Sequence, residues 1–243
     1  MKRDTLKKEY EITHATFCVA GYVPPSGLFN MFQEVATLHA NELGFGWEAI
    51  DVLKRAFVIT KQKVVIKNPL QKVGVVSCET WPVAGGGRIA SREYIIRDKD
   101  GEVLVVSSSK WVLIDIEKRQ IAKLDDVYQL PGIKFREDMA IEDAIFTKVL
   151  KNENFKLAET VVIKKSHIDV NMHLNNVRYT EFIFDALSSE EVERGILEFE
   201  ISFVKECKLG DEIKIYREAV GDEVRLVGEK EEQVVFSSVV KLA

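Results

Sequence analysis

The polar residues best suited to chemistry are concentrated in one short segment. Asp169, Asn171 and His173 alternate there with the apolar residues Val170 and Met172. An extended backbone would place the three polar side chains on one side, because successive side chains of a strand point to opposite faces. A carboxylate could activate a water molecule, a carboxamide could orient it, and an imidazole could carry its proton near neutral pH.

The same segment leads directly into a predicted helix. Asn175 or Asn176 can cap that helix. Its apolar positions recur at helical spacing: Tyr179, Phe182, Ile183, Ala186 and Leu187. Because the first N–H groups of a helix are unpaired and its dipole is positive there, this helix start is a candidate oxyanion site. Polar groups in front of such a helix indicate acyl-transfer chemistry.

The pattern Asp-x-Asn-x-His-x-Asn-Asn-x-x-Tyr resembles the catalytic segment of the acyl-ACP thioesterases, plant and bacterial enzymes that release fatty acids from acyl carrier protein (ACP). Further blocks resemble the same family in the same order, so the resemblance covers nearly the whole chain. These blocks are Glu42-Leu43-Gly44-Phe45-Gly46, residues 81–97, Lys110-Trp111-Val112 and Lys205-Glu206-Cys207.

This resemblance implies an α+β chain with two tandem hotdog folds, each a long helix wrapped by a curved antiparallel sheet. It also implies hydrolysis of the acyl-ACP thioester in fatty acid biosynthesis, and it maps Glu206 and Cys207 onto a pair associated with the active site. Glu206 could orient His173 or hold the water. We interpret Cys207 as a residue that lines the site. Whether water, Asp169 or Cys207 attacks the carbonyl carbon is left open.

Hydrophobic periodicity independently predicts a helix and an antiparallel sheet, twice. Corresponding elements are offset by roughly 140 to 150 residues, which is typical of a duplicated unit. The first set comprises a strand at 9–19, a helix from Leu28 to a Gly44 end, strands at 56–66, 73–81, 89–97 and 103–116, and a hairpin turn at 98–101. The second comprises a strand at 155–165, a helix at 176–187, and strands at 197–207, 212–219, 223–230 and 233–242.

We therefore expect an N-terminal hotdog at 1–130, a connector at 131–153 and a catalytic hotdog at 154–243. Within the charged region 117–153, residues 136–150 could form a helix. Only the second half carries the polar triplet, which predicts one active site per chain. The first half would shape an acyl pocket, with Phe29, Phe32 and Val35 as candidate lining residues.

Composition excludes several classes of protein. The net charge of −5 over 243 residues argues against nucleic acid as the main partner, and no apolar run approaches the length of a membrane span. A charged start and three dispersed cysteines indicate a cytoplasmic protein without disulfides. Asp169-x-Asn171 resembles the start of a calcium loop, but His173 and Leu174 do not fit that loop. We expect no metal and no cofactor.

The expected partner is ACP, with its acyl chain linked through phosphopantetheine. Because ACP is acidic, basic side chains near the site are docking candidates. These are Lys164, Lys165 and Arg178 beside the motif, and Arg88 and Arg92 near a strand start.

Two alternatives remain. One is an acyl-CoA thioesterase, and the other is a non-catalytic acyl-ligand sensor. The sensor is disfavoured because the first strand is expected within about ten residues of Met1, which leaves no room for a helix-turn-helix. Chain-length preference and homodimerisation are left open.

Overall fold

The computed structural model describes residues 4–46, 49–83, 87–128 and 133–243. The chain forms two compact units. The first comprises Met1–His14 and Asn30–Ala144, and the second comprises Ala15–Phe29 and Ile145–Ala243. This division differs from the expected one, because residues 15–29 belong to the second unit and the expected connector 131–153 is divided at residue 144.

The first unit is an antiparallel sheet with one long helix, α1 (Pro25–Leu43), of which residues from Asn30 onward belong to this unit. Its strands pair in the order β1-β3-β4-β5-β2, and β6 pairs with β5. The bounds are β1 (Leu6–Ile12), β2 (Arg55–Ile66), β3 (Gly74–Val83), β4 (Ile89–Arg97), β5 (Val103–Asp115) and β6 (Gln120–Ile121), with two short helices, α2 (Ile50–Leu53) and α3 (Asp125–Tyr128).

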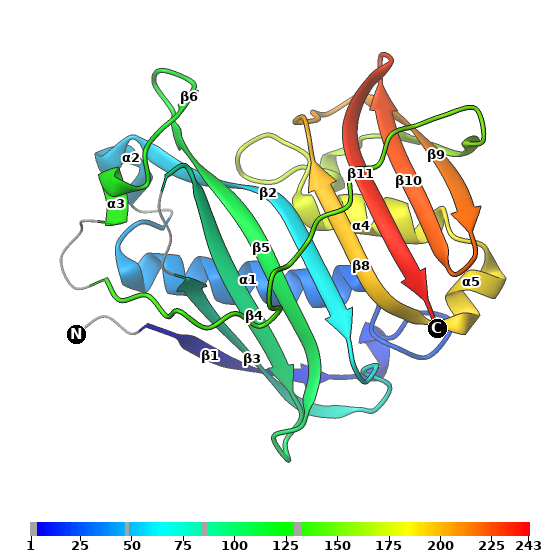
Figure 1. Ribbon diagram of the computed structural model, residues 1–243, viewed down its shortest axis with the longest axis horizontal. Coiled ribbons are helices and arrows are strands. Elements are labelled where there is room, and N and C mark those ends of the chain that lie inside the picture. The colour runs from blue at the N-terminus through cyan, green and yellow to red at the C-terminus, as the bar shows by residue number, and fades with distance from the viewer. Residues whose placement is uncertain (1–3, 47–48, 84–86, 129–132) are drawn as a thin grey trace. The chain divides into compact units, whose positions relative to one another are not determined.

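The second unit repeats this plan. Its strands follow the order β8-β11-β10-β9-β7. The bounds are β7 (Lys156–Val162), α4 (Asn176–Asp185), α5 (Ser189–Arg194), β8 (Ile196–Phe203), β9 (Glu212–Val220), β10 (Glu223–Lys230) and β11 (Gln233–Leu242). In both units the strand before the long helix ends the order on one side, and the strand after it ends the order on the other. In the first unit this order runs from β1 to β2 (Figure 1). The duplicated α+β architecture is confirmed.

The long helices pack through aromatic side chains. In the first unit, the ring of Phe32 on α1 lies 4.9 Å from that of Tyr94 on β4. In the second unit, Tyr179 on α4 packs edge-on against Phe203 and Phe236 of the sheet. Gly44 has a φ of 84°, the left-handed conformation that ends a helix, so the predicted end of α1 is confirmed.

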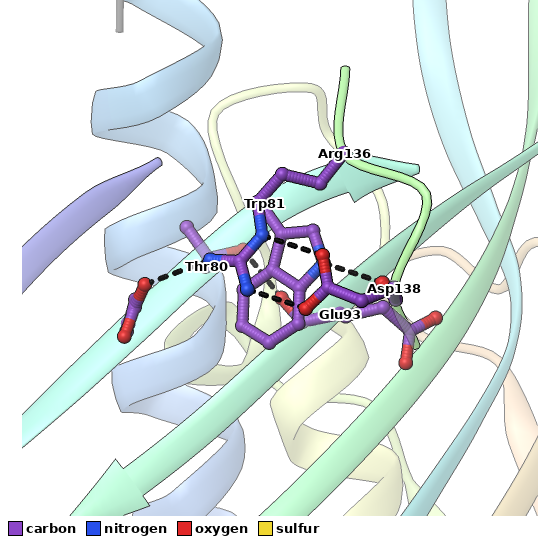
Figure 2. Close-up of polar contacts among 6 residues, drawn as sticks. Thr80, Trp81, Glu93, Arg136 and Asp138 are labelled. Carbon is purple, nitrogen blue, oxygen red and sulfur yellow. Dashed lines mark hydrogen bonds and ion pairs between the residues drawn. The ribbon is translucent and has the colours of Figure 1, made fainter. Parts of the chain in front are cut away.

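Two local predictions are wrong. The strand expected at 9–19 stops at Ile12, and a 3-10 turn, His14–Thr16, follows it. Residues 136–150 form no helix, because this segment crosses the sheet of the first unit up to residue 144 and bonds to it. The N–H of Arg136 donates to the carbonyl of Pro82, and the indole N–H of Trp81 donates to the carbonyl of Asp138 (Figure 2).

Arg136 anchors this crossing segment. Its guanidinium carbon lies 4.1 Å from the ring centroid of Trp81, and its Nη1 lies 3.1 Å from Oε1 of Glu79. Figure 2 shows the guanidinium of Arg136 over the indole of Trp81, with the carboxylate of Asp138 beside it. Further along, the N–H of Ala140 donates to the buried carboxylate of Glu93 at 3.1 Å. The segment's backbone is thus satisfied by the sheet instead of by a helix.

Among the described residues, no helix is long and apolar enough to cross a membrane. Nor do the His, Cys, Asp and Glu side chains in this part of the chain form a group of three or more that could hold a metal ion.

Candidate active site

Residues 169–173 form a tight turn, which corrects the expectation of an extended backbone. The N–H of Asp169 donates to the carbonyl of His173 at 2.9 Å, and Met172 has a positive φ of 64°. Val170 and Met172 are 78% and 67% exposed, so no apolar face is buried here. The alternating pattern arose from a loop whose apolar side chains face solvent.

The carboxylate of Asp169 holds this turn together. Its Oδ1 atom accepts the N–H of Asn171 at 2.8 Å and that of His173 at 3.3 Å. Such side-chain-to-backbone bonds are typical of Asp in turns. Within the described part of the chain, no hydrogen bond engages Oδ2 of Asp169. That second oxygen is therefore available to a water molecule, while the first keeps Asn171 and His173 in place.

His173 is paired with Glu206. Its Nε2 atom lies 3.2 Å from Oε2 of Glu206, and the two side chains are 32% and 63% exposed. The neighbouring backbones are also joined, because the N–H of Leu174 donates to the carbonyl of Cys207 at 2.8 Å. The structure thus brings together the motif turn and the loop that carries Glu206, as the family resemblance implied.

The start of α4 follows the turn. Asn175 is its N-cap, and its Oδ1 accepts the N–H of Val177 at 2.9 Å, which confirms one of the two predicted caps. The N–H of Arg178 donates to the carbonyl of Asn175. Because these two N–H groups are occupied, the backbone N–H of Asn176 is the candidate oxyanion donor at this helix start.

Cys207 is fully buried, and burial raises the pKa of its thiol. A nearby Asp211 carboxylate raises it further, whereas the hydroxyl of Tyr179 and the ammonium of Lys230 oppose the rise. A reactive cysteine needs an accessible thiolate. This environment therefore favours the interpretation of Cys207 as a residue that supports the site over a role as nucleophile.

The acyl-pocket candidates are all buried on α1. Phe29, Phe32 and Val35 are 3%, 1% and 0% exposed. Phe29 belongs to the second unit, where its ring packs edge-on against Phe199 at 5.6 Å. Phe32 and Val35 belong to the first unit. Their burial fits apolar core packing equally well, so their role in an acyl slot stays a prediction.

Four of the five docking candidates lie at least partly at the surface, and the fifth is buried. Lys164, Lys165 and Arg88 are exposed, and the half-buried Arg178 pairs with Glu181 at 2.5 Å. Arg92 is buried, which corrects its assignment as a docking residue. Its Nη1 lies 3.1 Å from Nδ1 of His39 and 3.3 Å from the hydroxyl of Thr80, so it cannot meet a protein at the surface.

Two residues near the turn were given no role in the site from the sequence. Tyr179 is buried, and its hydroxyl donates to the carbonyl of Lys205 at 3.4 Å. His167 accepts the N–H of Lys164 through Nδ1, and its carbonyl accepts the N–H of Asn175. Tyr179 ends the motif and belongs to the apolar stripe of the helix, but neither pattern indicated a role for its hydroxyl, and nothing in the local pattern marked His167.

Comparison with known proteins gives matches over both halves of the chain. The family described as acyl-ACP thioesterase N-terminal domain matches residues 3–130, and that described as acyl-ACP thioesterase C-terminal domain matches residues 150–242. An oleoyl-acyl carrier protein thioesterase from Arabidopsis thaliana is 26% identical over 201 residues, which is 75% of this chain and 55% of the relative. A dodecanoyl-[acyl-carrier-protein] hydrolase from Umbellularia californica is 26% identical over 194 residues, which is 74% of this chain and 50% of the relative. The matched part thus spans about half the length of these curated relatives.

Solved structures share the fold over almost the entire chain. An acyl-ACP thioesterase from Bacteroides thetaiotaomicron has a TM-score of 0.87 at 24% identity and covers 99% of this chain and 98% of its own. The 12:0-ACP thioesterase from Umbellularia californica has a TM-score of 0.89 at 20% identity, covering 98% and 97%. These neighbours confirm the tandem hotdog architecture.

Proposed function

The chain belongs to the acyl-ACP thioesterase family, and from that membership we propose that it hydrolyses the thioester of fatty acyl-ACP, releasing a free fatty acid and holo-ACP. The observation that carries this proposal is the pairing of His173 with Glu206 beside the Asp169 turn and the start of α4. This arrangement supplies each group that thioester hydrolysis requires.

The reaction needs an activated water and a donor for the oxyanion. In the proposed mechanism the free Oδ2 of Asp169 and the amide of Asn171 orient a water against the carbonyl carbon. His173, held by Glu206, takes the proton as the new C–O bond forms. The N–H of Asn176 stabilises the oxyanion. The C–S bond then breaks, and the proton passes from His173 to the thiolate of phosphopantetheine.

The leaving group requires little help. A thiol has a pKa of about 8.5, so its thiolate leaves far more readily than an amine would. For this reason the main requirement on the site is to activate the attacking water. It needs no covalent intermediate on the buried Cys207.

The partner in this proposal is ACP. The exposed Lys164 and Lys165 flank the motif turn, and Arg88 is exposed in the first unit. Exposed cations near the site would attract an acidic carrier protein and speed its docking.

The test is steady-state hydrolysis of a panel of acyl-ACPs and the matching acyl-CoAs. The wild type is compared with Asp169→Asn, His173→Ala and Cys207→Ser. We expect a preference for ACP, strong losses in the first two variants, and retained turnover in Cys207→Ser. Comparable turnover of CoA thioesters would identify an acyl-CoA thioesterase instead. An inactive Cys207→Ser variant together with a trappable acyl-enzyme would make Cys207 the nucleophile.

Tight acyl binding by the wild type without any turnover would refute the proposal that this chain is an enzyme. The panel also reports acyl chain preference directly. Each methylene contributes only about 0.8 kcal/mol to apolar burial, so neighbouring chain lengths will differ by modest factors.

A further inference from the structure

Glu206 lies in a loop that regular secondary structure does not hold. β8 ends at Phe203 and β9 begins at Glu212, and the side chain of Glu206 is 63% exposed. An exposed ion pair contributes little net stability, because solvent screens it and both side chains lose freedom. The contact with His173 therefore cannot by itself hold the loop in position.

Buried contacts hold the residues on either side of Glu206. On one side, the hydroxyl of Tyr179 donates to the carbonyl of Lys205 at 3.4 Å. On the other, the carbonyl of Cys207 accepts the N–H of the buried Leu174 at 2.8 Å. Leu174 directly follows His173 in the chain. Both contacts thus tie the loop to the segment that carries His173 and to the helix after it.

Tyr179 itself is held rigidly. It is 3% exposed, and its ring packs edge-on against Phe203 at 5.5 Å and Phe236 at 5.6 Å. Burial raises the pKa of its hydroxyl, so the phenol stays neutral and can act as a hydrogen-bond donor.

From these contacts we propose that Tyr179 is a positioning residue, whose buried hydroxyl holds the loop that carries Glu206 against His173. The proposal rests on the proposed function, since it concerns the same hydrolytic site. It assigns a role to the hydroxyl of Tyr179 beyond the packing of α4.

The expected consequence is a loss of rate with little loss of substrate binding. Without the Tyr179 hydroxyl, the Lys205 carbonyl loses a partner and Glu206 leaves His173 for a larger share of the time. Misplacement of a catalytic group by about 1 Å can cost roughly 100-fold in rate. For Tyr179→Phe we therefore expect kcat to fall by up to about tenfold, no more than for loss of the Glu206 charge, with KM changed less than about threefold.

The second unit contains a matched control. Tyr22 is also buried, and its hydroxyl donates to the carbonyl of Val192 on α5 at 3.0 Å. Tyr22→Phe removes the same group from the same kind of environment, but its acceptor is on α5 instead of the loop that carries Glu206. We expect both variants to lower Tm, but only Tyr179→Phe to lower kcat. Equal kcat values in the two variants would overturn the proposal.

A double variant separates positioning from general destabilisation. If Tyr179 acts through Glu206, adding Tyr179→Phe to Glu206→Gln should reduce kcat no further than Glu206→Gln alone. Independent effects would instead multiply. A double variant that multiplies the two losses would therefore also refute a positioning role.

A structural measurement keeps this test apart from the test of function. In a crystal structure of Tyr179→Phe we expect the contact between Nε2 of His173 and Oε2 of Glu206 to be lost, whereas Tyr22→Phe should retain it. If the wild type hydrolyses no acyl-ACP, the proposed function fails, and these two structures still decide the positioning role. An intact contact in Tyr179→Phe would overturn it.

Discussion

The Nε2 atom of His173 lies 3.2 Å from Oε2 of Glu206, and this contact joins two loops of the second unit. A carboxylate in this position fixes the orientation of the ring and stabilises the cation that forms when His173 takes a proton. General acid–base groups typically contribute 100- to 10,000-fold to rate, so His173→Ala should lower kcat by about that factor.

Glu206→Gln keeps the size of the side chain and removes its charge, so we expect a smaller loss, about tenfold. Steady-state hydrolysis of one acyl-ACP by both variants checks this order. A Glu206→Gln variant with the activity of the wild type would show that the charge is dispensable.

Asp169 serves the turn with one oxygen and is available for chemistry with the other. Asn can still accept the N–H groups of Asn171 and His173, whereas its second polar atom is a donor that cannot activate water. Asp169→Asn should therefore keep stability within about 1 kcal/mol of the wild type while losing at least about 100-fold in kcat.

Asp169→Ala is the comparison, because it removes both roles and should reduce stability as well as rate. Denaturant unfolding and steady-state kinetics measure the two effects separately. If Asp169→Asn unfolds as readily as Asp169→Ala, the acceptor geometry proposed for the turn is wrong.

The lysines beside the motif provide a test of carrier docking. Lys164 and Lys165 are exposed, so reversing the charge of either one should barely affect folding. For Lys164→Glu we expect KM for acyl-ACP to rise about tenfold at low salt with kcat nearly unchanged, and the effect to shrink as salt screens the attraction.

Lys156→Glu makes the same change at the opposite end of β7 and should leave KM unaltered. An acyl-pantetheine substrate, which lacks the protein carrier, should not distinguish the variants. A rise in KM for that small substrate as well would mean that Lys164 affects the site itself instead of the carrier.

Sequence patterns succeeded for strands that turn residues bound on both sides. β5 and β10 were located to within a residue, although Ser107, Ser108 and Ser109 at the centre of β5 are buried and polar. The end of α1 was equally clear, since Gly44 takes a conformation that other residues adopt with difficulty. The family resemblance supplied the partner of His173, because nothing local links it to Glu206.

Two of the errors share one physical cause. A helix was considered possible at residues 136–150, yet the bonds of Arg136 and Ala140 go to strands far away in the sequence. Likewise, Asp169 satisfies the backbone of its own turn, so the alternation around it does not produce a strand. A local pattern cannot show when a distant or side-chain group replaces the usual backbone partner.

The carboxylate of Glu93 gives the first unit a pH dependence. It is buried, and burial raises its pKa above the ordinary 4.5, although hydrogen bonds from Ser108 and Ala140 and the charge of Lys110 oppose the rise. At low pH the group is protonated in both folded and unfolded chains. As the pH rises through the unfolded value, the unfolded chain ionises first, so the contribution of Glu93 to the free energy of unfolding decreases.

Glu93→Gln removes this titration and retains an acceptor for the N–H of Ala140. Relative to the wild type, the variant should therefore gain stability as the pH rises above the ordinary glutamate pKa of 4.5, as measured by denaturant unfolding. The exposed Glu102→Gln is the control and should show no such trend. A stability difference for Glu93→Gln that stays constant over this range would show that the segment anchored by Ala140 does not depend on the charge of Glu93.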